Sequence, residues 1–164
     1  MDDYKFDNIY REIKNLNQLD HENVVNLFHV VKDKRKLLLI MEDGGKLSLA
    51  GLLRKSNTIP EIKVKRIFRQ IVEGIRHCHE RRICHRDIKL ENILIDGSEQ
   101  VRLIDFGFSA TCGERLRNFC GTPPYMAPEI TAKQPYFGEP ADMWAMGILL
   151  YLMLIGKFPF RATS

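Results

Sequence analysis

The stretch Cys84–Ile95, which reads CHRDIKLENILI, decides how the rest of the chain is interpreted. It places Asp87, Lys89 and Asn92 at offsets of zero, two and five, between two short apolar runs. The carboxylate can accept a proton from a hydroxyl, the ammonium can neutralise charge on a moving phosphate, and the amide oxygen can ligate a hard cation. These three groups on one tight loop therefore suit phosphoryl transfer.

Two further motifs follow this loop in order. A DFG sequence at Asp105–Gly107 comes directly after the apolar run 101–104, and an APE sequence lies at Ala127–Glu129. Each motif alone is weak evidence, but the three together resemble the eukaryotic-type serine/threonine protein kinase family, in which they occur in this order. The loop sequences are most similar to the calcium/calmodulin- and AMP-regulated groups. The resemblance covers nearly all of the chain.

The resemblance implies an ATP-dependent serine/threonine protein kinase, which transfers the γ-phosphate of ATP to hydroxyls of protein substrates. ATP and Mg²⁺ would be its cofactors. Asp87 would orient the substrate hydroxyl and act as base, and Lys89 would contact the γ-phosphate. Asn92 and Asp105 would hold the magnesium ion. Thr122, in the loop expected to receive the substrate peptide, would hydrogen-bond toward Asp87 and Lys89.

The same resemblance implies a nucleotide site farther from the loop. Met41, Glu42 and Asp43 resemble the end of a strand and the hinge that follows it, where backbone groups would bind adenine. Met41 would be the gatekeeper residue, and Leu94 would touch the adenine ring from below. Glu12 would be the helix glutamate that pairs with a strand lysine near the phosphates.

Composition and charge exclude several other classes of protein. The chain has 164 residues, 45% of them hydrophobic and 28% charged, which indicates a folded domain rather than a disordered segment. The net charge of +4 is spread over scattered lysines and arginines, and no nucleic-acid-binding motif is present, so no nucleic-acid partner is expected. The oligomeric state stays open.

The four cysteines do not have the spacing of a disulfide framework. The N-terminus is polar and acidic, unlike a signal peptide, so we expect an intracellular, cytoplasmic protein with reduced thiols. A zinc site is not expected at His77, Cys78, His79, Cys84 and His85. Residues 77 and 79 would point to different faces of a helix, and His85 belongs to the catalytic loop.

Hydrophobic periodicity and turn signals predict the main elements. A capping-box spacing at Thr58–Glu61 is expected to open the longest helix. The predicted elements are a helix over 4–19, strands over 24–31 and 36–41 joined by a turn at 32–35, a long helix from Thr58 past Cys78, and a hairpin of 93–95 with 101–104.

The run Met143–Ile155 carries no charged residue. Thirteen residues are too few to cross a bilayer, which needs about 20, so we expect a buried core helix and no membrane span. The preceding pattern Asp142-x-Trp144 resembles a kinase helix in which Asp142 would anchor the catalytic loop from behind.

The expected fold class is α+β, an incomplete protein-kinase-like fold. Residues 1–42 would be a remnant of the small lobe, with a helix and two strands, and residues 43–164 a truncated, mainly helical large lobe. No glycine-rich loop and no Val-Ala-x-Lys sequence precede Glu12. The alternative to an active kinase is therefore a catalytically weak or inactive kinase-like binding or scaffold protein.

The activation segment between the DFG and APE sequences departs from the family pattern. The position that many related kinases phosphorylate falls on Asn118, which has no hydroxyl. Arg86 would normally bind that phosphate through its guanidinium. We therefore expect Arg86 to bind another acceptor, with the Asn118 amide oxygen as the candidate, and the segment to be either ordered by packing alone or mobile.

Overall fold

The computed structural model describes residues 3–33 and 36–160. Its α-helices are α1 (Asp3–Leu16), α2 (Leu49–Ser56), α3 (Glu61–Glu80), α4 (Pro128–Thr131) and α5 (Gly138–Ile155). Short 3-10 turns lie at Leu90–Asn92 and Pro123–Tyr125. The strands are β1 (Leu27–Lys32), β2 (Leu37–Met41), β3 (Leu47–Ser48), β4 (Ile83–Cys84), β5 (Ile93–Ile95), β6 (Val101–Leu103) and β7 (Ala110–Thr111). The mixture is an α+β fold, as predicted.

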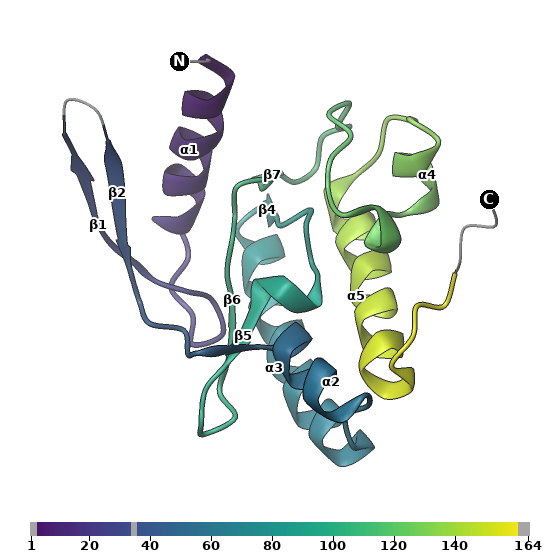
Figure 1. The fold of residues 1–164 in the computed structure, drawn as a ribbon. Coiled ribbons are helices and arrows are strands. Elements are labelled where there is room, and N and C mark those ends of the chain that lie inside the picture. The colour runs from purple at the N-terminus through teal and green to yellow at the C-terminus, as the bar shows by residue number, and fades with distance from the viewer. Residues whose placement is uncertain (1–2, 34–35, 161–164) are drawn as a thin grey trace.

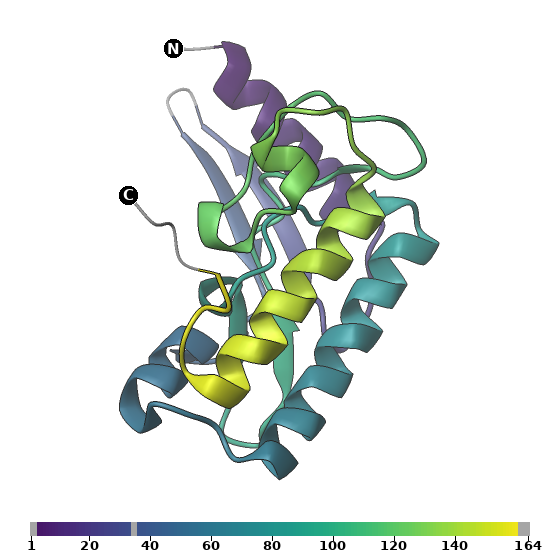
Figure 2. The ribbon, with the colours of Figure 1, turned by 90° about the vertical axis from the view of Figure 1, so that its right-hand side faces the viewer.

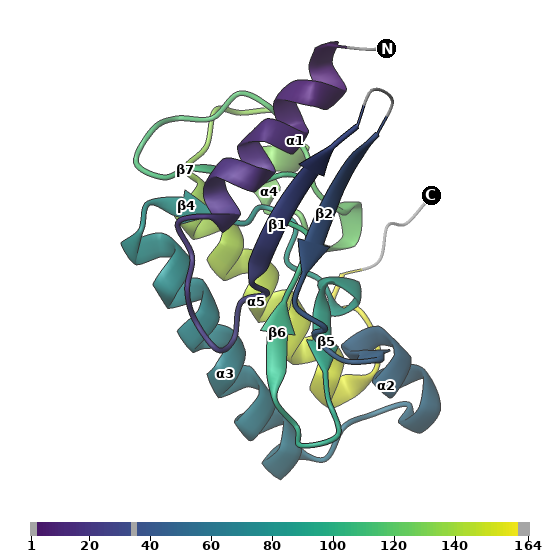
Figure 3. The same cartoon turned by 90° about the vertical axis from the view of Figure 1, so that its left-hand side faces the viewer.

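The elements divide into two sides with short strands between them. Figure 1 shows α1 and the β1–β2 hairpin on one side, α4 and α5 on the other, and α3 with the strands β4–β7 between them. Figure 3 shows α1 beside the β1–β2 hairpin. The catalytic-loop sequence lies in the centre, because it joins β4 to β5.

The main core forms where α3 and α5 pack together, as Figure 2 shows. Of the apolar stripe predicted along α3 (Val64, Ile67, Phe68, Ile71, Val72, Ile75 and Cys78), all but Val72 pack into this core, whereas Val72 is exposed. Burying each such side chain contributes roughly 1.5–3 kcal/mol. The buried side chains include Val64, Ile67, Ile71 and Ile75 of α3 and Ile148, Leu149, Leu152 and Met153 of α5.

Helix α5 is longer than its uncharged run, because it begins at Gly138. By length and composition alone its 18 residues could cross a membrane, but half of that window is buried inside the fold. A core helix has these same properties, and the burial of Leu149 and Met153 shows that α5 acts as one here.

The first predicted strand begins later than expected. Residues 23–25 do not continue the hairpin, because they pair with β6: Val25 N–H donates to Leu103 O (3.0 Å), and Leu103 N–H donates to Asn23 O (2.9 Å). Strand β1 therefore starts at Leu27 and pairs antiparallel with β2. The predicted turn at 32–35 lies partly outside the described residues.

The predicted capping box at the start of α3 is wrong. The helix begins at Glu61 and its N-cap residue is Pro60, which has no side-chain acceptor for the first-turn N–H groups. The chain before it is held instead by Ile59 N–H, which donates to Met153 O (3.1 Å). Proline suits this place because its fixed φ precedes the helix without strain.

Strands β5 and β6 form the predicted hairpin, with Ile93 opposite Leu103 and Ile95 opposite Val101. Strand β3, which periodicity did not predict, pairs with β5 as a third strand. Its last residue, Ser48, caps α2 by accepting a hydrogen bond from Gly51 N–H (3.2 Å).

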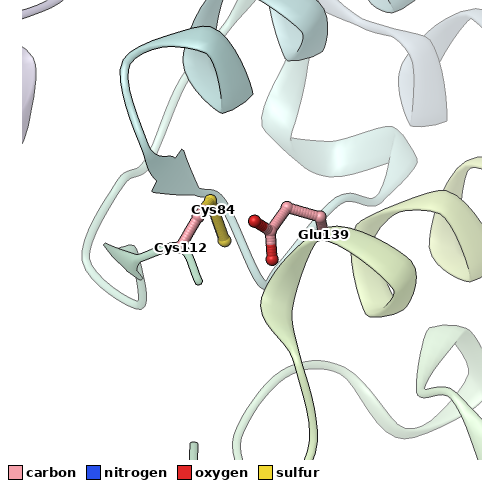
Figure 4. A group of neighbouring side chains, drawn as sticks. All are labelled: Cys84, Cys112 and Glu139. Carbon is pink, nitrogen blue, oxygen red and sulfur yellow. A yellow bond between two sulfur atoms is a disulfide. The ribbon is translucent and has the colours of Figure 1, made fainter. Parts of the chain in front are cut away.

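The expectation of reduced thiols fails for one pair of cysteines. Cys84 at the end of β4 and Cys112 just after β7 are joined by a disulfide, as Figure 4 shows. They are 28 residues apart in sequence, so spacing did not reveal the pair. Cys78 and Cys120 are free. The cluster of possible metal ligands found among the described residues is Cys84, Cys112 and Glu139, not the histidine-rich segment.

Candidate active site

The catalytic loop is anchored by a buried carboxylate on α5. Asp142, with a fully buried side chain, accepts hydrogen bonds from His85 N–H (2.9 Å) and Arg86 N–H (2.8 Å). It also lies 2.8 Å from the His79 ring nitrogen Nε2. Arg86 has a φ of 66°, an unusual conformation that this pair of bonds holds in place. The predicted anchoring role of Asp142 is confirmed.

His85 connects the loop to Ile104, the residue directly before the DFG sequence. Asp87 N–H donates to His85 Nδ1 (3.2 Å), so Nε2 carries the proton and donates to Ile104 O (3.0 Å). The ring also packs on Phe106, with centroids 4.7 Å apart. The side chain is fully buried, so His85 holds two motifs together rather than facing a substrate.

Four of the predicted site residues meet at Asp87. Its Oδ2 accepts from Lys89 Nζ (2.6 Å) and Asn92 Nδ2 (3.1 Å), and its Oδ1 accepts from Thr122 Oγ1 (2.7 Å). Lys89 Nζ also donates to Thr122 Oγ1 (3.0 Å). Thr122 is 35 residues away in sequence, so the activation segment folds back onto the catalytic loop.

This network leaves a carboxylate, an ammonium and a hydroxyl at one point. Asp87 is only 3% exposed, but charge-assisted bonds satisfy both of its oxygens. The Thr122 hydroxyl shows that a hydroxyl donor fits against Oδ1 of Asp87. Lys89 supplies positive charge at the same place. The group can therefore accept a hydroxyl hydrogen and neutralise an anion beside it.

Asp105 and Glu12 lie at a second point of the site. Asp105 is exposed and has a φ of 64°, and its Oδ1 accepts from Gly107 N–H (3.3 Å). Burial raises the pKa of Glu12, and the nearby charge of Asp105 raises it further, against a lowering by a hydrogen bond from the Phe106 backbone. Two carboxylates thus lie close together, and this concentration of negative charge would favour binding of a hard cation.

Glu12→Gln tests this pairing through pH. Because the folded pKa of Glu12 is raised, its protonation stabilises the fold; that contribution is complete below the ordinary value of 4.5 and is lost as pH rises through the folded pKa. We expect the variant to melt at a higher temperature than the wild type at pH 8 and at the same temperature near pH 4. Thermal denaturation at both values, with exposed Glu114→Gln as control, measures it. A difference between Glu12→Gln and wild type that does not change with pH would refute the pairing.

The predicted hinge is only partly available to a ligand. Glu42 N–H donates to Asn26 O (2.8 Å), and its side chain accepts from Arg102 Nε (2.7 Å). Asp43 is exposed, and its Oδ1 accepts from Gly45 N–H (3.0 Å). Glu42 therefore has a structural role through its N–H and side chain, which leaves its carbonyl as the polar group for a base.

Leu94 lies near this hinge, beside Gly44, and Met41 is the first residue of the hinge. Leu94 packs so closely that a Cβ on Gly44 would lie 2.9 Å from its Cδ1. Met41 is the last residue of β2 and is half-buried against the core. The structure thus places the hinge residues at one end of β2, separate from the Asp87 network, on a different segment of chain.

Arg86 binds neutral oxygens instead of a phosphate. Its Nε donates to Phe108 O (2.7 Å), and its Nη1 donates to the Tyr136 hydroxyl (3.0 Å) and Asn118 O (3.3 Å). The Asn118 acceptor is the backbone carbonyl, so the expected side-chain amide contact is wrong. Sequence inspection missed Tyr136, because nothing marks a tyrosine 50 residues away as a partner of Arg86.

A basic hollow lies beside Arg86. Its volume is about 1080 Å³, and Glu114 is the acidic residue on its lining. Cations from α1, the end of α3 and the activation segment surround it: Arg11, Lys14, Arg81, Arg82, Arg115 and Arg117. So many cations around one hollow favour the binding of an anion there. The neutral oxygens that Arg86 contacts nevertheless hold the activation segment without a bound anion.

The comparisons with known proteins agree with this fold. The family model described as protein kinase domain matches residues 1–164. The chain belongs to the protein kinase family.

Named relatives are similar over almost the whole chain. Sperm motility kinase 3A of Mus musculus is 37% identical over 164 residues, which are 99% of this chain and 32% of that protein. Sperm motility kinase 2B of Mus musculus is 37% identical over 158 residues, covering 95% of this chain and 33% of that protein. The probable serine/threonine-protein kinase MARK-A of Dictyostelium discoideum is 36% identical over 158 residues, 95% and 15% of the two chains. The chain spans a third or less of these relatives.

Proposed function

We propose that this protein is an ATP-dependent serine/threonine protein kinase, which acts on hydroxyls of protein substrates inside the cell, in the cytoplasm. The observation that carries the proposal is the network joining Asp87, Lys89, Asn92 and Thr122. Lys89 two residues after Asp87 suits serine/threonine specificity, and one relative carries that specificity in its name.

The residues have the following roles in the proposed reaction. Asp87 accepts a hydrogen bond from the substrate hydroxyl and takes its proton, and Lys89 neutralises charge on the transferred phosphoryl group. Thr122 fixes both side chains relative to each other. Asn92 and Asp105 offer amide and carboxylate oxygens, the ligands that Mg²⁺ prefers. When bound, Mg²⁺ offsets the negative charge of the β- and γ-phosphates.

The domain division is also a proposal. Residues 1–42 correspond to part of a small lobe and residues 43–164 to part of a large lobe, with the hinge at Met41–Asp43. Adenine would lie on Leu94 and against the Glu42 carbonyl. Glu12 would complete the site as partner of a cation near the phosphates.

A second candidate is a kinase-like binding protein with little catalysis. The observation that favours it is that Glu12 faces Asp105, a like charge, with no lysine between them in residues 3–33 and 36–160. A protein with this arrangement would bind partners through its kinase surfaces without efficient phosphate transfer.

Calorimetry with ATP on the 164-residue chain tests the nucleotide site. We expect weak binding that requires Mg²⁺, because the sequence lacks a glycine-rich cover and a Val-Ala-x-Lys lysine before Glu12. Asp105→Asn is expected to abolish this Mg²⁺-dependent binding, and exposed Asp33→Asn is the matched control. Binding that is as tight without Mg²⁺ would contradict the proposed ligands.

Asn118→Asp tests whether the activation segment needs a negative charge. Because Arg86 already donates to three neutral oxygens, we expect the new carboxylate to change phosphate transfer by no more than about fivefold. Rates measured side by side with wild type decide it. A gain of a hundredfold would show that the segment is disordered until a charge reaches Arg86.

A further inference from the structure

The disulfide between Cys84 and Cys112 lies directly behind the catalytic loop. Cys84 precedes His85, and Cys112 lies seven residues after Asp105, at the start of the activation segment. Both side chains are buried, with exposures of 0% and 3%. Figure 4 shows Glu139, from the first turn of α5, beside the two sulfur atoms. The bond therefore joins the two segments that carry the proposed site.

The loop closed by this bond contains the proposed chemistry. The 28-residue separation encloses Asp87, Lys89, Asn92 and Asp105. The backbone already pairs β4 with β7, and Cys112 N–H donates to Arg82 O (2.7 Å). The two segments are thus adjacent by hydrogen bonding, and the disulfide adds a covalent link to a pairing that can exist without it.

We propose that Cys84 and Cys112 form a reversible oxidative modification site, which fixes the start of the activation segment against the catalytic loop when oxidised and releases it when reduced. This inference deepens the proposed function by adding regulation of the same site, and it depends on that function for its intracellular setting. Disulfides in reducing compartments are usually transient and redox-sensing rather than permanent.

The oxidation balances with a peroxide as oxidant. One thiolate attacks a peroxide oxygen, the O–O bond breaks, and a sulfenic acid and water form. The second thiol then attacks that sulfur and displaces its oxygen as a second water, so two thiols lose two electrons and two protons. A dithiol reductant reverses the change by thiol–disulfide exchange and leaves as its own disulfide.

Geometry distinguishes this pair from the other cysteines, because the Cα atoms of Cys84 and Cys112 lie 5.7 Å apart, whereas Cys78 and Cys120 are free. A ligand atom of Glu139 lies within 4.8 Å of both sulfur atoms, so a carboxylate lies beside the pair. A Cβ on Gly138 would lie 2.5 Å from Cys84 Sγ, so glycine makes room for that sulfur.

The site can open for exchange with reagents. Strand β7 has two residues and pairs with β4 alone, and Thr111 and Gly113 on either side of Cys112 are exposed. Short pairings of this kind open locally at a small free-energy cost. Opening of β7 uncovers Cys112 without disturbing the core between α3 and α5.

The test uses the 164-residue chain and needs no phosphate transfer, so its result is independent of the proposed activity. The chain is treated with dithiothreitol or hydrogen peroxide, alkylated in denaturant and digested. We expect four alkylated cysteines after reduction and two after oxidation, with a Cys84–Cys112 peptide pair that dithiothreitol removes again. Cys112→Ser should abolish the pair, and Cys120→Ser should leave it unchanged.

Hydrogen exchange of the two forms tests the proposed release. We expect amides of 110–113 to exchange on the order of tenfold faster or more after reduction, and those of α3 to keep their rates. Cys84→Ser should match the reduced form. Exchange that is equal in both forms would overturn the proposal, as would a peroxide product that links Cys120 instead. Zn²⁺ bound by the reduced protein in a way that blocks reoxidation would show a metal site in its place.

Discussion

Asp87→Asn is expected to lower the turnover of any active form of this protein by about 10²- to 10⁴-fold, with little change in its affinity for Mg-ATP. The asparagine oxygen can still accept from Lys89, and its amide group can donate to Thr122, so the loop keeps its shape. The carboxylate proposed to take the hydroxyl proton is lost. In the proposed site, nucleotide affinity would depend on other residues, Asn92, Asp105 and the hinge.

Steady-state rates and nucleotide affinity, measured on the same preparation, check this result. Glu80→Gln, which removes an exposed carboxylate at the end of α3, is the matched control and should keep the wild-type rate. A variant at position 87 that retained most of its turnover would show that another group acts as base. A parallel loss of turnover and nucleotide affinity would place Asp87 in the nucleotide site instead.

Asp142→Ala is expected to lower the free energy of unfolding by about 3–5 kcal/mol. The change leaves the buried N–H groups of His85 and Arg86 without an acceptor and empties a space beneath the catalytic loop. Asp142→Asn keeps one acceptor oxygen, so its loss should be about half as large.

Urea denaturation of the three proteins measures these differences. The exposed control Glu80→Gln should lie within about 0.5 kcal/mol of wild type. If Asp142→Ala were as stable as wild type, the catalytic loop would be held by other contacts, and the hydrogen bonds of Asp142 would contribute little.

The sequence predicted best where residues that contact one another are close in the chain or belong to a known spacing. The α3 stripe, the β5–β6 hairpin and the position of Asp142 behind the loop all follow from such patterns. Asp87, Lys89 and Asn92 lie within one segment, so their meeting in space was expected. Their roles in catalysis remain proposals.

The failed predictions depend on contacts between distant segments. Residues 24 and 25 left the predicted strand because β6 offers the segment 23–25 partners about 80 residues away. The Cys84–Cys112 pair and the Tyr136 contact to Arg86 likewise need the folded chain to bring them together. At the start of α3, Pro60 took the cap position, because φ restriction outweighed the capping-box pattern.

The most direct test of the proposed function is transfer of radiolabelled γ-phosphate from Mg-ATP by the protein purified from the cells that make it. The acceptors are three peptides that differ only in carrying serine, threonine or tyrosine. We predict label on the serine and threonine peptides, none on the tyrosine peptide, and loss of all label when Mg²⁺ is removed or Asp87 is replaced by asparagine. Label on tyrosine alone, or no label from protein that binds Mg-ATP, would contradict the assignment.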